Sequence, residues 1–271
     1  MARVNVASSA SREHSLTGEK LALLAVFAHP EDESFGPAGT LAKYASEGVQ
    51  VSLVTTTRAA RAPGNGDGVQ LNVIPHTHGP RDRLCSCRTT GIRRACYFDV
   101  LPGNLDKIDP LVIEDQLVRL IRELEPQVII TFGSDGMSGD IEHQIVSRVA
   151  TAAFHSAGDP DKFPHHFREV LGTYAPQKLY YCVLPQSMVE RWGIEGVMAV
   201  PDKHITTILD VSAHTSAINK ALYCQRSDSS DMVRWLTKER HAQWDSEYYS
   251  LVATRLNKKP RREKDLFAGL R

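Results

Sequence analysis

LALLAVFAHPEDESFGPAGT, residues 21–40, contains the sharpest change of character in the chain. Its first part, Leu21–Phe27, is apolar on both faces of an extended backbone, which is typical of a fully buried strand in a parallel sheet. The run ends in His29-Pro30-Glu31-Asp32-Glu33, so an imidazole and three carboxylates follow the carboxyl end of that strand. Charges withdrawn from water must be paired or must coordinate a metal, and this edge of an open α/β sheet is where ligands bind. The stretch therefore predicts a metal site, and one suited to hydrolysis.

Strand and helix patterns alternate along the rest of the chain. A helix is expected over 39–47, and the β-branched run 50–57 predicts a second strand, so that a βαβ unit with a right-handed crossover forms. Further strands are expected at 95–100, 128–132, 178–184 and 205–211, and further helices at 83–90, 110–125, 141–157, 213–224 and 232–251. This order predicts an α/β fold with a doubly wound, mostly parallel, Rossmann-like sheet in a three-layer αβα arrangement.

The pattern predicts a single domain over residues 19–257. Residues 1–18 are small and polar, which indicates a flexible lead-in. The segment 58–80 has repeated Gly, Pro, Asn and Asp and no apolar period, so it is expected to be a loop, either a functional lid or a disordered segment. Residues 258–271 form a basic tail whose charges predict a solvated end.

Composition excludes several classes of protein. Lys and Arg together number 32, as do Asp and Glu, and the zero net charge gives no global electrostatic case for nucleic acid. No apolar run reaches the ~20 residues that span a bilayer, and the first residues contain no signal-peptide core, so a cytoplasmic protein without membrane contact is expected. Five cysteines show no secreted framework and predict reduced thiols. Cys85-Ser86-Cys87 could hold a metal but lacks a second pair.

The metal ligands can be predicted from strand ends. His29 and Asp32 follow the first strand, and His143 lies in the first turn of the helix after strand 128–132, so one edge of the sheet brings all three together. Three nitrogen and oxygen ligands leave a fourth position on Zn²⁺ for water, whose pKa then falls towards ~7. Glu31 is placed to take a proton from that water and to return it to a leaving amine.

Each of these residues also has an ordinary structural interpretation. A histidine after a strand is often a hydrogen-bonding residue, and acidic residues after proline often mark a helix N-terminus. The combination of a buried strand, His-Pro-Glu-Asp-Glu and a second strand followed by Glu-His favours the metal site. A nucleotide-binding protein is disfavoured, because no G-x-G-x-x-G follows the first strand and an acidic loop would repel phosphate.

The stretches AHPEDESF and LAKYASEGVQVSLVTTT resemble the LmbE-like/PIG-L family. The resemblance runs over about residues 20–157, lapses at 59–90, and returns weakly at 220–227 and 247–252. It implies a zinc-dependent hydrolase that removes an N-acetyl or other N-acyl group from an amino-sugar conjugate of the N-acetylglucosamine type. The partner would then be a small molecule, and a homo-oligomer is compatible with the sequence.

Site residues carry over from the family's motifs. In its AHPDDE motif the His and the second Asp bind zinc and the first Asp is the general base, so His29 and Asp32 become ligands and Glu31, one methylene longer, the base. The family's GHPDH motif matches residues 139–143 and makes His143 the third ligand. Asp140 stands where the family has a catalytic histidine that stabilises the transition state. A carboxylate cannot donate a hydrogen bond there unless it is protonated.

Two residues are expected to bind substrate. The family often has Arg-Gly-Glu after its second strand, whereas this chain has Arg58-Ala59-Ala60 and lacks that acidic partner. Asp99 resembles the family's acidic segment after the third strand, although turn formation would also explain it. The altered positions leave two hypotheses: a zinc-dependent N-deacetylase, or a non-catalytic sugar-conjugate-binding protein on the same metal-binding scaffold.

Overall fold

The computed structural model describes residues 20–58, 69, 71–73, 81–225, 245–257 and 262–271. Its strands are β1 (Ala22–Phe27), β2 (Gln50–Thr55), β3 (Leu71–Val73), β4 (Arg94–Phe98), β5 (Val128–Phe132), β6 (Lys178–Cys182), β7 (Thr207–Asp210) and β8 (Ser246–Thr254). Its α-helices are α1 (Asp32–Phe35), α2 (Ala38–Ser46), α3 (Arg81–Thr90), α4 (Pro110–Leu124), α5 (Ile141–Ser156), α6 (Gln186–Trp192) and α7 (Thr215–Cys224). Among these helices, none combines the length and apolar composition needed to cross a bilayer.

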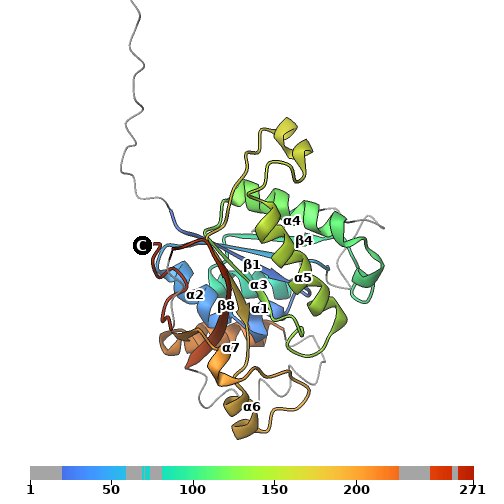
Figure 1. Ribbon diagram of the computed structural model, residues 1–271. Helices are drawn as coiled ribbons and strands as arrows, with labels where there is room; N and C mark the ends of the chain where they lie inside the picture. The colour runs from blue at the N-terminus through green and yellow to red at the C-terminus, as the bar shows by residue number, and fades with distance from the viewer. Residues whose placement is uncertain (1–19, 59–68, 70, 74–80, 226–244, 258–261) are drawn as a thin grey trace, which may run out of the picture.

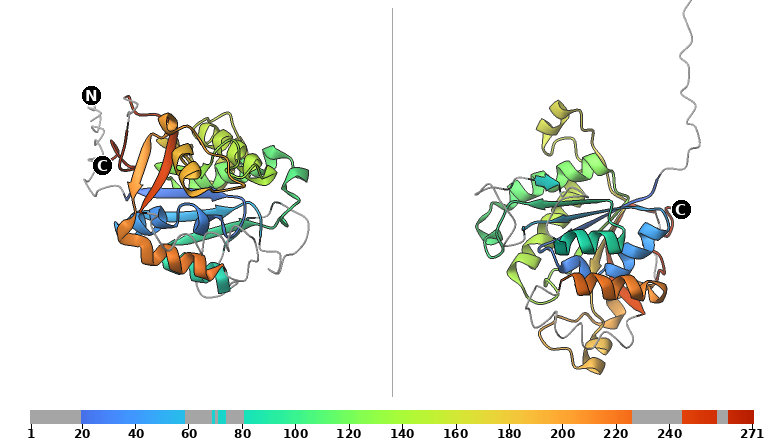
Figure 2. Two further views of the ribbon diagram at one scale, coloured as in Figure 1. Left: turned by 90° about the horizontal axis from the view of Figure 1, so that it is seen from below. Right: turned by 180° about the vertical axis from the view of Figure 1, so that it is seen from behind.

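The described strands form one sheet in the order β3-β4-β2-β1-β5-β6-β8-β7 (Figure 1). The central strands β4, β2, β1, β5 and β6 are parallel, and β3, β8 and β7 pair antiparallel with their neighbours. Helices α4 and α5 cover one face, and α2, α3 and α7 cover the other (Figure 2). The predicted doubly wound, mostly parallel, three-layer fold is confirmed.

Strand β1 lies where the direction of winding reverses. The chain passes from β1 through β2 to β4 on one side and then returns to β5 and β6 on the other. Every residue of β1 is buried, as its continuous apolar sequence requires. The carboxyl ends of β1 and β5 are therefore the switch point at which such sheets open a crevice for ligands.

Helix α4 has the boundaries that its sequence predicts. Asp109 caps it, accepting a hydrogen bond from the Leu111 amide at 2.9 Å, and Pro110 occupies the first turn, where a missing N–H costs nothing. The helix ends before Glu125, which adopts a left-handed conformation with φ 48°. Apolar residues at helical spacing bury one face of α4 in the core.

Residues 246–251, predicted as the end of a helix, instead belong to strand β8. Alternate residues of this strand, Glu247, Tyr249 and Leu251, are buried, as expected for a strand. The alternation is hidden in the sequence because one buried position is a glutamate. Its carboxylate accepts the Gly39 and Thr40 amides at the start of α2, both at 2.8 Å. The rest of the predicted helix, 232–244, lies outside the described residues.

The C-terminal segment is packed rather than solvated. Glu263 is 6% exposed and accepts a hydrogen bond from the fully buried Lys178 ammonium at 2.5 Å. Phe267 is buried against the ring of Tyr44, with centroids 5.1 Å apart. The prediction of a solvated tail is therefore wrong from Glu263 onward. The hydrogen-bonded ion pair between Glu263 and Lys178 of β6, which is distant in sequence, holds this segment against the sheet. The boundary of the domain at residue 257 stays a prediction.

The segment predicted as one long loop contains a strand. β3 pairs antiparallel with β4, with Asn72 opposite Tyr97. Three residues are too few for a periodic pattern to emerge from the surrounding Gly, Pro and Asn. Most of the predicted loop, 59–68 and 74–80, lies outside the described residues, as does the lead-in 1–18.

The prediction of reduced thiols is wrong at one pair, because Cys85 and Cys224 form a disulfide. It joins α3 to the end of α7, which pack side by side, and it removes Cys85 from any metal site with Cys87. Cys87, Cys96 and Cys182 are buried and are not disulfide-bonded. A bond between residues 139 apart cannot be read from cysteine spacing.

Removing this disulfide is expected to lower stability. Cys224→Ser should reduce the free energy of unfolding by about 2–4 kcal/mol, because the unfolded chain regains the freedom that a long cross-linked loop denies it. Urea denaturation with and without a dithiol reductant measures the effect: the reductant should destabilise the native protein and leave the variant unchanged. Thiol titration of the unfolded, unreduced protein should find three thiols, those of Cys87, Cys96 and Cys182. Five titratable thiols would contradict the bond.

Candidate metal centre

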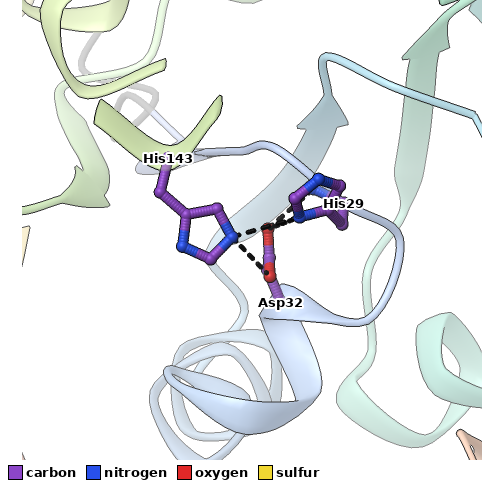
Figure 3. A group of neighbouring side chains, drawn as sticks. All are labelled: His29, Asp32 and His143. Atoms are coloured by element: carbon purple, nitrogen blue, oxygen red, sulfur yellow. Dashed lines mark hydrogen bonds and ion pairs between the residues drawn. The ribbon is translucent and has the colours of Figure 1, made fainter. Parts of the chain in front are cut away.

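The three predicted ligands meet at the switch point of the sheet (Figure 3). His29 follows β1, Asp32 begins α1, and His143 lies in the first turn of α5 after β5. The His29 Nδ1 and His143 Nε2 atoms are 3.1 Å apart. Asp32 Oδ1 lies 3.4 Å from His143 Nε2, and Asp32 Oδ2 lies 3.8 Å from His29 Nδ1. One donor atom of each residue thus lies within 4.8 Å of the others.

Asp32 is fixed by the turn that it closes. Its Oδ2 atom accepts the backbone amides of Ala28 and His29 at 3.0 and 2.7 Å, which bends the chain back immediately after β1. Asp32 is only 6% exposed. The carboxylate therefore keeps one oxygen for the backbone and directs the other towards His143, so its position does not depend on a flexible side chain.

The ring of His143 is held on two sides, and the backbone that carries it is fixed by a helix cap. Phe132 at the end of β5 stacks on it with centroids 4.0 Å apart, and His143 Nδ1 donates to the Gly136 carbonyl at 2.9 Å. Asp140 caps α5, accepting the Glu142 and His143 amides at 2.7 and 3.2 Å. Gly136 has φ 71°, and a Cβ there would lie 2.8 Å from His143 Cβ, so only glycine fits this close approach.

Glu142 is a site residue that the sequence analysis missed. Its Oε2 accepts from His29 Nε2 at 2.8 Å, and its carboxylate also accepts the Gly103 and Leu105 amides at 3.0 and 2.8 Å. Burial would raise the pKa of Glu142, but these amides and His29 lower it overall. A carboxylate that orients a histidine from behind is typical of metal sites. The sequence signal that could have identified Glu142 as a site residue was its position next to His143 in the matched motif.

The geometry of the donor atoms fits a divalent cation. His29 Nε2 and His143 Nδ1 each face an oxygen acceptor, so each ring donates its outward proton and turns a lone pair inward. Two lone pairs and a carboxylate facing one another repel unless a cation or protons separate them. Metal–ligand distances of about 2.0–2.2 Å at tetrahedral angles place ligand atoms about 3.4 Å apart. His143 Nε2 lies 3.1 Å from His29 Nδ1 and 3.4 Å from Asp32 Oδ1, and both distances are close to that value.

Protons take the place of a cation in the metal-free centre. Burial would lower the pKa of His143, but the charge of Asp32 and its hydrogen bond raise it to about 9. Burial likewise would raise the pKa of Asp32, and the two histidines lower it overall. At neutral pH, therefore, the metal-free centre holds an ionised Asp32 and a protonated imidazole. A metal must displace that proton in order to bind.

Metal affinity is accordingly expected to fall as the pH falls below about 9, the pKa of His143. Displacement of one proton predicts about a tenfold loss of affinity per pH unit, and the dependence should flatten above that pKa. Competition with a chelator between pH 6.5 and 9.5 measures the slope, and calorimetry in buffers of different ionisation enthalpy counts the protons released. An affinity independent of pH over this range would contradict the proposed ligand set.

The structure also places the other predicted site residues. Glu31 occupies the N-cap position of α1, is half-buried, and contributes to raising the pKa of His29. Asp140 is exposed and acts as the cap of α5. Arg58 Nε lies 2.7 Å from Asp99 Oδ1 in a largely buried ion pair beyond the ends of β2 and β4. Asp99 thus supplies the acidic partner that the sequence near Arg58 lacks.

A pocket opens beside the centre on the β5 side. Asp32 and His143 form part of its wall, and the cavity volume is about 90 Å³. Most of the remaining wall is carbon and sulfur, contributed by residues such as Phe27, Phe35, Phe132, Leu184, Met188 and Val197. A water needs about 10–15 Å³ by this measure, so the cavity has room for a small apolar group of a ligand.

A second cluster, Asp115, His165 and His166, has metal-like spacing but the wrong proton arrangement. Arg122 Nη1 lies 3.2 Å from His166 Nδ1, and a guanidinium can only donate. His166 therefore accepts at Nδ1 and keeps its proton at Nε2, 3.1 Å from Asp115 Oδ1. A protonated nitrogen beside a buried guanidinium is a poor metal ligand, so this cluster is a weaker candidate for a metal site than His29, Asp32 and His143.

Comparison with known proteins places the chain in a family. The model of the PIG-L family, described as GlcNAc-PI de-N-acetylase, matches residues 24–154, which contain all three converging ligands. A 1D-myo-inositol 2-acetamido-2-deoxy-alpha-D-glucopyranoside deacetylase of Saccharopolyspora erythraea is 30% identical over 90% of this chain and 99% of its own length. The chain belongs to the PIG-L family. Another PIG-L relative, the mycothiol S-conjugate amidase of Streptomyces coelicolor, is 29% identical over 93% of this chain and 98% of its own.

Solved structures of remote sequence share the PIG-L fold. The N,N'-diacetylchitobiose deacetylase of Pyrococcus horikoshii has a TM-score of 0.62 at 14% identity and covers 86% of this chain and 84% of its own. GalB of Pseudomonas putida, a 4-carboxy-2-hydroxymuconate hydratase, has a TM-score of 0.60 at 15% identity and covers 88% and 99%. Because proteins of different activity share this architecture, the fold alone does not give the reaction.

Proposed function

We propose that the chain is a zinc-dependent N-deacetylase that hydrolyses the amide of an N-acyl amino-sugar conjugate. The observation that carries this proposal is the inward orientation of the His29 and His143 lone pairs around the Asp32 carboxylate. The printed names of two relatives support the choice: one is a deacetylase of a 2-acetamido-2-deoxy-glucopyranoside of myo-inositol, and the other is an amidase of mycothiol S-conjugates.

Zinc held by His29, Asp32 and His143 would lower the pKa of a water towards ~7 and polarise the acyl carbonyl. Glu31 accepts a proton from the attacking water and returns it to the nitrogen as the C–N bond breaks. The acyl group leaves as a carboxylate and the sugar as a free amine. Glu142 keeps His29 in the tautomer that presents Nδ1 to the metal.

Asp140 is proposed to act by position. Its carboxylate accepts two amides of α5 and so fixes the turn that carries His143. It does not replace the oxyanion donor that the family has at this position, and the loss of one such donor typically lowers turnover by about 10²–10³. We therefore expect a slow deacetylase.

Arg58 and Asp99 are proposed to bind the sugar. Their ion pair is 12% and 5% exposed and lies past the ends of β2 and β4, and it combines a guanidinium, which donates, with a carboxylate, which accepts. Sugar hydroxyls both donate and accept, so such a pair suits a polyhydroxylated ring. The corresponding variant, Asp99→Asn, is expected to raise KM more than it lowers kcat.

Metal analysis beside a deacetylation assay tests the function. Protein purified without chelators should contain about one zinc per chain and release acetate from N-acetylglucosaminides, including an inositol conjugate. Iron in place of zinc would change the metal but not the reaction. Protein that binds no divalent metal and cleaves no member of the panel would refute the proposal.

The second candidate function is a non-catalytic sugar-conjugate-binding protein. It is favoured by Glu31 in place of the family's aspartate and by the missing donor at Asp140. A content of about one metal ion per chain, tight binding of an N-acetylglucosaminide and no turnover would support it. With either function, we place the protein in the cytoplasm, where thiols are usually reduced. A disulfide such as Cys85–Cys224 is rare in that compartment, so the thiol titration described above also tests the location.

A further inference from the structure

The surroundings of the metal centre are strongly asymmetric. On one side of β1, beyond β2 and β4, lie the charged side chains of Arg58 and Asp99. On the other side, past the carboxyl ends of β5 and β6 and the start of β8, lies the pocket whose wall is mostly carbon and sulfur. His29, Glu31 and Arg58 are not part of that wall, whereas Asp32 and His143 are. The centre thus stands between a polar side and an apolar side.

The titratable residues in the wall do not place a free charge there. The Glu247 carboxylate accepts the Gly39 and Thr40 amides at 2.8 Å each, and the Tyr249 hydroxyl donates to Thr40 Oγ1 at 2.7 Å. Burial raises the pKa of the Cys182 thiol well above its ordinary value, so the thiol is neutral. Apart from the metal ligands and the hydroxyls of two serines and Tyr248, the described pocket therefore presents a mostly apolar surface to a ligand.

The outer wall comes from α6 and the residues that follow it, which project from the body of the molecule (Figure 1). Met188, Ile194 and Val197 contribute its side chains. This segment is bonded to the loop between β5 and α5. The Met198 amide donates to the Met137 carbonyl at 2.5 Å, and the neighbouring Gly136 carbonyl orients His143. The pocket and the metal centre are thus built on one connected loop system.

An N-acyl sugar has the same asymmetry. Its carbonyl carbon must lie at the metal ligands, with the amino sugar extending in one direction and the acyl chain in the other. A sugar matches the Arg58–Asp99 side, and a hydrocarbon chain matches the side of Phe132 and Val197. The methyl group of an acetyl is about the size of one water, which needs about 10–15 Å³, so it would leave most of a cavity of about 90 Å³ unfilled.

We propose that the preferred substrate carries an apolar N-acyl chain longer than acetyl, seated in the pocket between β5, β8 and α6. This inference rests on the proposed function and specifies the substrate of the same site. Hydrolysis would add one water across the amide and release an alkanoate and the free amino sugar.

The test compares two substrate series with metal-loaded protein. In the first, the methyl glycoside of glucosamine carries N-acetyl, N-butanoyl, N-hexanoyl or N-octanoyl. We expect kcat/KM to rise by about fourfold for each methylene until the pocket is filled, as burial of hydrocarbon predicts. In the second, the acyl group stays acetyl and the aglycone is methyl, butyl or hexyl, and no comparable rise is expected. A rise in the second series alone would overturn the proposal.

Binding of the alkanoate products separates this inference from the proposed function. Calorimetry with acetate, butanoate, hexanoate and octanoate should show the same increase in affinity with chain length. If no substrate is cleaved but alkanoate affinity rises with chain length, the acyl pocket is supported and the deacetylase activity is refuted. If acetyl is cleaved and neither series responds to acyl length, the deacetylase stands and the acyl pocket is wrong.

Variants of the pocket wall test where the acyl chain of the substrate binds. Val197→Trp fills the pocket and should lower the octanoyl-to-acetyl ratio of kcat/KM at least tenfold. Met188→Gln, of similar size and half-buried, should lower the same ratio and guards against misfolding of the first variant. Met198→Trp is the matched control, because its side chain is 49% exposed and outside the pocket wall. Equal ratios in Val197→Trp, Met188→Gln and the wild type would overturn the proposal.

Discussion

Asp32→Asn is expected to remove the metal and to lower kcat/KM for amide hydrolysis by at least about 10³. The substitution keeps the size of the side chain, and its carbonyl oxygen can still accept the Ala28 and His29 amides. What it removes is the negative charge beside two imidazoles, which attracts a cation and serves as its third ligand. Loss of a bound Lewis acid forfeits several kcal/mol of transition-state stabilisation, and each 1.36 kcal/mol is about a factor of ten in rate.

Asp109→Asn is the matched control for this variant. Asp109 is also an aspartate at the start of a helix that accepts a backbone amide, but it is exposed and caps α4. The control should keep its metal and its rate. Metal content by elemental analysis gives a readout that does not depend on turnover. An Asp32→Asn protein that retains one metal per chain and wild-type kinetics would exclude Asp32 as a ligand.

Glu263→Ala is expected to lower the free energy of unfolding by about 3–5 kcal/mol. The substitution leaves Lys178, which is fully buried, without its counter-ion, and removal of one partner of a buried pair strands the other charge. Tyr180 also donates to Glu263, so a second buried polar group loses its acceptor. The segment from Glu263 to Phe267 should then detach from the sheet.

Two further variants separate charge from packing in this cluster. The double variant Lys178→Met with Glu263→Leu replaces the pair by apolar groups and should recover most of the loss. Glu169→Ala removes a carboxylate from an ion pair with Arg119 that is about 40% exposed, and it should cost less than about 1 kcal/mol. Urea denaturation compares all three. A loss below about 1 kcal/mol for Glu263→Ala would show that the buried pair does not hold the C-terminal segment.

The sequence predicted most reliably what depends on local pattern. Leu21–Phe27 is apolar throughout, so its burial in mid-sheet and the position of His29 at its end followed directly. His143 could be placed because β5 and the start of α5 both have clear signals, and parallel strands end at one edge. The convergence of His29, Asp32 and His143 is a consequence of those strand ends.

What the sequence could not predict depends on partners distant along the chain. Glu247 was taken for part of a helix because nothing nearby shows that two amides of α2 satisfy it. Glu263 was taken for a solvated residue because Lys178, its partner, lies 85 residues away. Asp99 pairs with Arg58 across two neighbouring strands, and the Cys85–Cys224 bond joins two helices. A one-dimensional pattern carries no record of such contacts.

The acceptor that Glu247 provides for the start of α2 has a consequence for biosynthesis. Its partners Gly39 and Thr40 leave the ribosome more than 200 residues earlier, and N-terminal segments generally begin to fold first. During translation, the helix that follows His29 and Asp32 must therefore wait for an anchor that is made more than 200 residues later. The loop that carries these ligands acquires its finished support only after Glu247 has been synthesised, so metal uptake is expected to follow that stage.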